Sequence, residues 1–143
     1  MLARAGQRFL LHGTSSHDPL DVAVAGLDKR YSRPTNYYGP GLYFTDNLFY
    51  VHNGKYCKHS RAFRNKTYRV LLCSVLIGNY QRLHNATPET TEVVEGGPHR
   101  TCSGLRCGSG TMWVVRSNPA VYPAYIAEYT RPKLEARYHG DQV

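Results

Sequence analysis

The segment that most constrains the fold of this chain is residues 68–77, which read Tyr-Arg-Val-Leu-Leu-Cys-Ser-Val-Leu-Ile and end at Gly78. The segment is apolar almost throughout and rich in aliphatic residues. A short apolar run closed by glycine is typical of a strand that is covered on both faces. The sequence therefore predicts a domain built around a sheet with this segment at its centre.

Shorter elements are expected around this strand. We predict further strands at residues 9–12, 42–45, 112–115 and 125–129, and helices at residues 18–25 and 46–58. The first helix begins with Asp18 and Pro19, a suitable N-cap followed by proline at the first helical position, and it ends at Gly26. We expect Leu20 and Val24 to share its buried face.

The remaining segments are predicted to lack regular structure. Residues 81–110 contain several glycines and are interpreted as mostly irregular, and residues 133–143 as a tail. The Ser-Asn-Pro sequence at 117–119 predicts a hairpin or corner turn between the last two strands. About five strands and two short helices in 143 residues indicate one α+β domain dominated by its sheet.

Two strand ends present polar side chains. The apolar run 9–11 ends at His12, which is followed by Gly13. Residues 37–46 read Tyr-Tyr-Gly-Pro-Gly-Leu-Tyr-Phe-Thr-Asp, a tight turn that leads into a strand and places Tyr43 at a fixed position. The loop at 27–40 between these strands is polar and basic, as expected for a lid or ligand clamp. We therefore expect His12 and Tyr43 to form one site.

The net charge and the cysteines indicate which partners, metals and cellular compartments to expect. A net charge of +8 favours partners that carry phosphate, such as nucleotides, nucleic acid or anionic surfaces, although the basic residues form no run. The cysteines lack CxxC spacing, so a disulfide framework is not expected. Ligands near Cys57 and His59, or at Cys102 and Cys107, lack the two tight pairs of most zinc sites, so no metal is predicted. Residues 1–7 have no apolar signal core and no run is long enough to span a membrane, so an intracellular setting, cytoplasmic or nuclear, is expected.

Five segments, in order, resemble the catalytic domain of the poly(ADP-ribose) polymerase family, the diphtheria-toxin-like ADP-ribosyltransferases. They are Leu-Leu-His-Gly-Thr at 10–14, Gly-Leu-Asp-Lys-Arg at 26–30, Tyr-Gly-Pro-Gly-Leu-Tyr-Phe at 38–44, Ile-Gly-Asn-Tyr at 77–80 and Val-Tyr-Pro-Ala-Tyr-Ile-Ala-Glu-Tyr at 121–129. The resemblance covers about residues 8–130. It implies an ADP-ribosyltransferase fold with two small, packed, mostly antiparallel sheets, short helices and a donor loop at 28–36.

The resemblance also implies that NAD is the substrate and that ADP-ribose passes to an acceptor. His12 would then hydrogen-bond a hydroxyl of the adenosine-side ribose, the Gly13 backbone would bind the nicotinamide carboxamide, and Tyr43 would stack on the nicotinamide ring. Ser15 and Arg30 would hold the adenine and phosphate end. The implied catalytic residues are His12, Tyr43 and Met112, and the implied NAD-binding residues are His12, Gly13, Thr14, Ser15, Arg30, Tyr38, Tyr43 and Tyr56.

The chain departs from the family pattern at several positions. Met112 stands where polymerising members carry their catalytic glutamate, and a thioether cannot polarise an attacking hydroxyl. Val51 stands where a serine commonly bonds the nicotinamide amide. The second stacking aromatic maps to Gly54, or to Tyr56 if two residues are inserted. Only residues 1–8 precede the His-Gly-Thr strand, so this N-terminus is reduced relative to the family or belongs to a fragment.

These departures leave three hypotheses. The leading one is a mono-ADP-ribosyltransferase that uses NAD as donor and a protein side chain or a nucleic-acid end as acceptor. The second is a non-catalytic module that binds NAD, ADP-ribose, RNA or a protein partner, which Met112 and Val51 favour. The third is the related tRNA 2′-phosphotransferase chemistry, which suits the positive charge but requires a pattern of basic residues that the sequence does not show.

Overall fold

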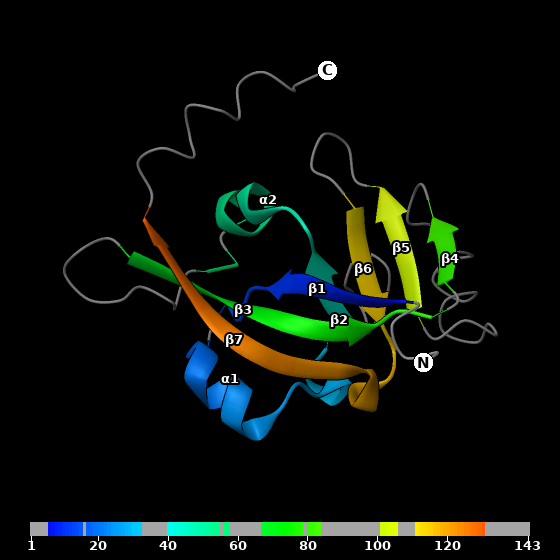
Figure 1. The fold of residues 1–143 in the computed structure, drawn as a ribbon, viewed down its shortest axis with the longest axis horizontal. Coiled ribbons are helices and arrows are strands. Elements are labelled where there is room, and N and C mark those ends of the chain that lie inside the picture. Colours follow the sequence, from blue (N-terminus) through cyan, green and yellow to red (C-terminus); the bar gives the residue numbers. More distant parts are fainter. Residues whose placement is uncertain are drawn as a thin grey trace, which may run out of the picture.

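The computed structural model describes residues 6–15, 17–32, 40–54, 56–57, 67–78, 80–83, 101–105 and 111–130. Figure 1 shows a twisted sheet with short helices on either side of it. The strands are β1 (Gln7–His12), β2 (Leu42–Thr45), β3 (Thr67–Leu76), β4 (Tyr80–Leu83), β5 (Thr101–Leu105), β6 (Thr111–Val115) and β7 (Val121–Thr130). The helices are α1 (Pro19–Ala25) and α2 (Leu48–Asn53), with 3-10 turns η2 (Lys29–Tyr31) and η3 (Asn118–Ala120).

The long strand predicted from residues 68–77 is confirmed as β3, which has a neighbour on each side. It pairs antiparallel with β1 along one edge and with β7 along the other, and Leu71 lies opposite His12 and Ile126. Alternate side chains enter two hydrophobic clusters, with Leu71 in one and Val70 in the other. A register shift in the pairing with β7 falls between Leu72 and Cys73, and such bulges increase strand twist.

The expectation of two packed sheets is not what the strand pairing shows. Hydrogen bonds join the strands of the described residues into one seven-stranded sheet in the order β4-β5-β6-β2-β1-β3-β7. All pairings are antiparallel except the parallel pair β4–β5. However, β1 and β2 share only one registered pair, Leu11 with Thr45. The sheet therefore consists of two half-sheets, β4-β5-β6-β2 and β1-β3-β7, that stay connected through a narrow joint.

The two helices cover opposite faces of the sheet (Figure 1). On the α1 side, Val22 and Ala23 pack against the cluster that contains Leu10 and Phe44. Leu20 and Val24, which were predicted to be buried, are instead 53% and 82% exposed, so that prediction is wrong.

Helix α1 is nearly all apolar, so more than one set of its apolar residues is spaced to form a continuous face. The face formed by Pro19, Val22 and Ala23 satisfies the i, i+3, i+4 pattern equally well. On the opposite side of the sheet, Val51 of α2 packs against Tyr68 and Val70. Both faces of β3 are thereby covered.

Other element boundaries differ from the sequence-based expectation. Helix α2 occupies only Leu48–Asn53 of the predicted 46–58, because Asn47 caps its first turn and Gly54 ends it. Residues 81–110 were predicted to be mostly irregular, yet they contain most of β4 and all of β5. The Ser-Asn-Pro segment is a corner and not a hairpin, because β7 continues along β3. The predicted tail at 133–143 lies outside the described residues.

Within the described part of the chain, no helix combines the length and the apolar character that crossing a membrane requires.

The packing of β3 gives a stability test. Leu71 is fully buried in the central strand, so Leu71→Ala is expected to lower the free energy of unfolding by about 2–5 kcal/mol through lost burial and the cavity it leaves. Leu76, on the same strand but 50% exposed, is the matched control, and Leu76→Ala is expected to cost about 1 kcal/mol or less. Urea unfolding of both variants measures the difference. Equal losses would mean that β3 is not the centre of the core.

Candidate functional site

The His12 side chain lies at the joint between the two half-sheets. Its Nδ1 is 2.7 Å from the backbone carbonyl oxygen of Tyr43. Because a carbonyl can only accept, Nδ1 carries the proton and donates. Burial lowers the pKa of His12 below its ordinary value, and the bond to Tyr43 opposes this shift more weakly. The imidazole is therefore neutral at pH 7 and its Nε2 retains a lone pair that can accept a hydrogen bond.

The rings of His12 and Tyr43 lie on different faces of the sheet. The imidazole packs against Phe44, with ring centroids 5.3 Å apart. Successive residues of a strand point to opposite faces, so Tyr43 points to the face that α2 covers, away from Phe44. The two side chains were expected to converge, but the structure joins the His12 ring to the Tyr43 backbone only, and the two rings lie on opposite faces. A ligand that touches both rings has to pass the end of β1.

That end of β1 is where Gly13 and Tyr56 come together. A Cβ on Gly13 would lie 2.5 Å from Tyr56 Cβ and 2.8 Å from its carbonyl oxygen, so only glycine fits against this backbone. The same carbonyl accepts a 2.7 Å hydrogen bond from the backbone N–H of Ser15, which has a positive φ of 47°. Of the two candidates for the second aromatic, Gly54 caps α2 and Tyr56 is the residue beside Gly13.

Met112 and Val51 lie on the same side of the sheet as Tyr43. Met112 pairs with Thr45 in the β2–β6 ladder, which makes it a diagonal neighbour of Tyr43, and such neighbours are about 7–8 Å apart. Met112 and Val51 are 4% and 2% exposed. Neither side chain carries a group that accepts a strong hydrogen bond, so this part of the site offers apolar surface only.

The other residues implied in NAD binding have different surroundings. Thr14 is buried, and its hydroxyl donates to the His17 carbonyl at 2.6 Å. Ser15 is exposed at the start of the connection to α1. Arg30 forms a 2.7 Å ion pair with Asp28, and its side chain is 81% exposed. Their roles toward a ligand stay predictions, and Tyr38 and residues 33–36 of the expected donor loop lie outside the described residues.

A cluster of polar aromatic residues that the sequence did not indicate holds α2 against the sheet. The Tyr129 hydroxyl is 2.9 Å from His52 Nδ1 and also hydrogen-bonds the buried thiol of Cys57. Tyr68 stacks on Tyr129 with ring centroids 5.5 Å apart, and His52 packs edge-on against Tyr68 at 4.7 Å. Burial raises the pKa of Cys57 and of Tyr129, so both stay protonated at neutral pH.

This cluster bears on the site because Cys57 directly follows Tyr56. A bond network that fixes Cys57 also fixes the backbone carbonyl that lies over Gly13. No local signal could have revealed the cluster, because its members come from α2, the segment that follows α2, β3 and β7.

No group of three His, Cys, Asp or Glu side chains among the described residues is placed to hold a metal ion. Residue 59, one of the ligands that were weighed, lies outside the described ranges, as does Cys107.

A split, mostly antiparallel sheet with a His-Gly turn beside a Gly-Leu-Tyr-Phe strand is the arrangement expected of an ADP-ribosyltransferase catalytic domain. The family model described as the poly(ADP-ribose) polymerase catalytic domain matches residues 3–124 of the chain. The chain therefore belongs to this family.

A relative in Dictyostelium discoideum, named as a probable poly [ADP-ribose] polymerase, is 30% identical over 122 residues. The aligned region covers 84% of this chain and 33% of the relative. The chain thus spans about a third of the length of that protein.

The partly buried imidazole of His12 predicts a pH dependence of stability. When the pH falls through about 6.5, the unfolded chain protonates residue 12 while the folded chain keeps it neutral, so the free energy of unfolding decreases below that pH. In His12→Asn, an amide N–H can still donate to the Tyr43 carbonyl but nothing titrates at this position. Urea unfolding at pH 7 and pH 5 is expected to show a smaller loss for the variant than for the wild type. An equal loss in both proteins would contradict the buried neutral state.

The polar cluster predicts a second stability difference. Tyr129→Phe removes the hydroxyl that bonds His52 and Cys57, and it is expected to lower the free energy of unfolding by about 1–2 kcal/mol. Tyr125→Phe, on the same strand but 64% exposed, is expected to change it by about 0.5 kcal/mol or less. Thermal or urea unfolding distinguishes the two. If Tyr129→Phe unfolds like Tyr125→Phe, the hydroxyl contributes nothing to the anchoring of α2.

Proposed function

We propose that the chain transfers a single ADP-ribose unit from NAD to an acceptor group. The observation that carries the proposal is the end of β1, where a neutral histidine bonds the Tyr43 backbone and the Gly13 backbone lies against Tyr56. Membership of the poly(ADP-ribose) polymerase family supports NAD as the donor. Because the chain aligns with only 33% of the Dictyostelium relative, the acceptor and the physiological partners have to be found by experiment.

Each group of the joint suits one part of the donor. The Nε2 lone pair of His12 can accept a hydrogen bond from a ribose hydroxyl on the adenosine side. On the other face, Tyr43 and Tyr56 offer aromatic surface for the nicotinamide ring, and stacking contributes about 1 kcal/mol beyond area burial. Gly13 allows a carboxamide to approach the backbone. An extended dinucleotide that passes the end of β1 reaches both faces.

The reaction itself asks little covalent chemistry of the protein. The bond between C1′ of the ribose and the nicotinamide nitrogen breaks, nicotinamide leaves with the bonding electrons, and an acceptor nucleophile attacks C1′ and releases its proton to solvent. The transition state carries positive charge on the ribose. The main contribution of the protein to the rate is therefore to orient the leaving nicotinamide and the attacking acceptor on either side of C1′. His12 and Tyr43 orient the donor in this scheme.

Met112 limits the product to one unit. Elongation requires a group that polarises a ribose hydroxyl of the growing chain, and a thioether cannot do so. Met112 is buried beside Thr45, at the position where such a group would lie next to Tyr43. A protein side chain is the preferred acceptor, and a nucleic-acid end is the alternative that the +8 charge favours.

The apolar character of this face also favours a second candidate, a non-catalytic module that binds NAD, ADP-ribose or RNA, or a protein partner. Val51 is buried in the cluster with Tyr68 and Val70, so it offers no hydrogen bond to a nicotinamide amide. Weaker capture of nicotinamide would lower transfer more than it lowers binding of the adenosine half. Binding and transfer must therefore be measured separately.

The test combines labelled NAD with calorimetry. Wild-type protein incubated with labelled NAD and a mixture of acceptor proteins is expected to add single units, detected by mass spectrometry, and NAD is expected to bind in the calorimeter. Tyr43→Ala and His12→Ala are each expected to reduce transfer at least tenfold through lost stacking or a lost ribose hydrogen bond. Tyr122→Ala removes a 69% exposed tyrosine of β7 and serves as the matched control.

The outcomes separate the two candidates. Binding of NAD without transfer would establish the non-catalytic module, and chains of several units would refute the role assigned to Met112. If neither binding nor transfer occurs, the transferase and the NAD-binding module are both wrong, and calorimetry with ADP-ribose and with RNA then tests the other ligands of the second candidate.

A further inference from the structure

Helix α2 covers only one end of one face of the half-sheet β1-β3-β7. It packs there over Tyr68 and Val70 of β3. Alternate residues of a strand return to the same face, and residues directly opposite in an antiparallel pair share a face. Toward the other end of β3, the same face therefore carries the residues that we call the open face: Gln7, Phe9, Leu72, Ser74, Leu76, Tyr122 and Tyr125.

The open face exposes large apolar side chains that are close neighbours. Phe9, Leu76, Tyr122 and Tyr125 are 55%, 50%, 69% and 64% exposed. Phe9 and Tyr122 both lie opposite Ser74, one on each neighbouring strand, so the three form one row across the sheet. A contiguous apolar patch of a few hundred Å² is a mark of an interaction site.

The charged side chains of these three strands lie on the other face. Arg8 is opposite Val75, and its guanidinium lies 5.0 Å from the centroid of the Trp113 ring on the α1 side. Arg69 and Glu128 lie opposite one another on that side too, and they form an ion pair at 2.8 Å. Within the described β1, β3 and β7, no Lys, Arg, Asp or Glu therefore belongs to the open face.

We propose that the open face is an interface with a second copy of this chain, related to the first by a twofold axis. Such an axis places the same patch on both sides of the contact, so any charge in the patch lies near its like. The chain carries a net charge of +8, and two copies repel each other wherever basic surfaces meet. On an uncharged apolar face this repulsion is smallest and the gain from burial is largest.

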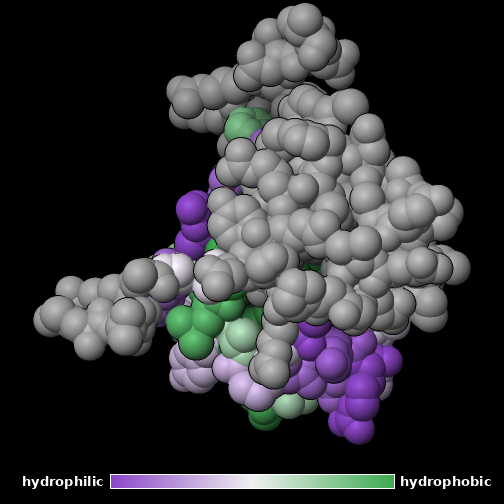
Figure 2. Space-filling model, turned by 90° about the vertical axis from the view of Figure 1, so that its right-hand side faces the viewer, coloured by the Kyte–Doolittle hydropathy of each residue, from purple (hydrophilic) through white to green (hydrophobic). Residues whose placement is uncertain are grey.

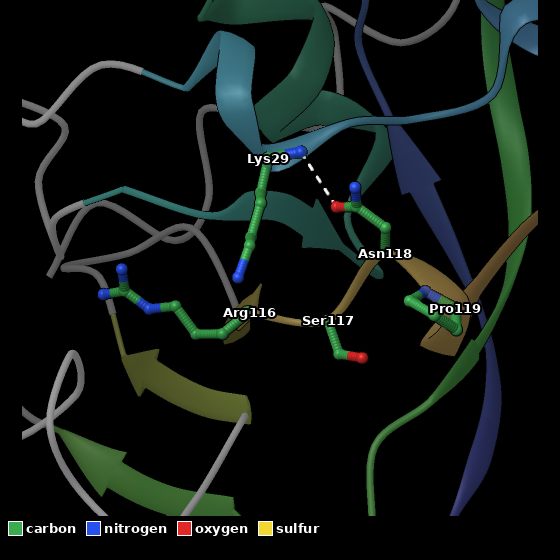
Figure 3. A pocket seen from close by; sticks show the side chains of 5 residues that line it. All are labelled: Lys29, Arg116, Ser117, Asn118 and Pro119. Carbon is green, nitrogen blue, oxygen red and sulfur yellow. Dashed lines mark hydrogen bonds between the residues drawn. The ribbon is translucent and has the colours of Figure 1, made fainter.

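The surface around η2 and η3 does not suit a contact between copies. Hydrophilic side chains gather in the lower part of the face in Figure 2, the level at which η2 and η3 lie in Figure 1. The hollow between η2 and the corner after β6 is lined by Lys29, Arg116, Ser117, Asn118 and Pro119 (Figure 3). Across a twofold axis, the two cations of this hollow would lie near those of the second copy.

The exposed rings are large enough to form the core of an interface. A fully buried aromatic side chain contributes about 150–250 Å², so the three rings, which are 55–69% exposed, offer roughly 300–400 Å². A stable interface buries about 800 Å² on each partner, with an apolar core inside a polar rim. The rings and Leu76 supply that core, and the exposed Gln7 belongs to the rim.

Single-stranded nucleic acid is the alternative occupant, because bases stack on aromatic side chains. Sites of that kind combine the aromatic side chains with a basic groove that follows the phosphates. The open face lacks the basic part, since Arg8 and Arg69 lie on the other face. The absence of charge from the described open face therefore favours a second copy over nucleic acid.

Analytical ultracentrifugation of the 143-residue chain, from micromolar to submillimolar concentration, tests the proposal. The wild type is expected to show a reversible equilibrium between monomer and dimer. Higher ionic strength is expected to strengthen the dimer, because salt screens the repulsion between two chains of charge +8 and leaves the apolar contact in place.

A matched pair of substitutions locates the interface. Leu76→Glu puts a carboxylate on the open face and is expected to weaken the dimer at least tenfold, because burial of an unpaired charge is unfavourable. The control is Leu20→Glu, at a leucine that is 53% exposed on α1, which covers the opposite face, and this variant is expected to dimerise like the wild type. Circular dichroism checks that both variants fold. If Leu76→Glu does not fold, Tyr125→Glu takes its place.

Three results would each overturn the proposal: a monomer at every concentration, a dimer that Leu76→Glu and Leu20→Glu weaken equally, and a dimer that salt dissociates. Binding of a labelled oligouridylate by a monomer, weakened by Leu76→Glu and not by Leu20→Glu, would assign the face to nucleic acid instead. The proposal does not rest on transferase activity, since the described groups of the NAD site come from a single chain.

Discussion

The hydrogen bond from His12 to the Tyr43 carbonyl spans the weakest line in the sheet. Backbone pairing between β1 and β2 is limited to one registered pair, and the imidazole adds a second link across the same joint. The proton must be on Nδ1 to make this link, so the fold selects the neutral tautomer that leaves Nε2 as an acceptor. In the proposed complex, Nδ1 of His12 therefore holds the two half-sheets together and Nε2 binds the donor.

The aromatic surface next to this joint depends on a different set of contacts. The Tyr129 hydroxyl bonds His52 and Cys57, so it holds α2 and the segment after it on β3 and β7. Tyr56 is placed over Gly13 as a result. The position of the Tyr56 aromatic surface therefore depends on α2 and on the edge strand β7, which pairs with β3 and not with β1. Through Cys57 and Tyr56, Tyr129 is thus linked to Gly13, which is far from it in the sequence.

What the sequence could predict was local. The apolar run of β3 and the caps of α1 are signalled by neighbouring residues, and the family segments located His12, Gly13 and Tyr43. Whether the strands form one sheet or two depends on hydrogen bonds between strands that are distant in the sequence, and no local sequence pattern predicts those bonds. Linear counting left Gly54 and Tyr56 as alternatives, and the contact between Tyr56 and Gly13 is visible only in the structure. The Asp28, Arg30 and Asn118 network joins segments that are distant in sequence, so it had no signature either.

The order of strands in the sheet has a consequence for how the chain acquires its structure. Strand β1 pairs with β3, and β3 with β7, so the half-sheet that carries His12 is assembled from segments near the beginning, middle and end of the described chain. Among the antiparallel pairs of the described strands, only β5–β6 joins strands separated by a short connection. Such a topology has a high contact order and folds slowly. During synthesis on the ribosome, β3 stays uncovered on one edge until β7 emerges, and the nascent chain then has an exposed apolar strand that chaperones can bind.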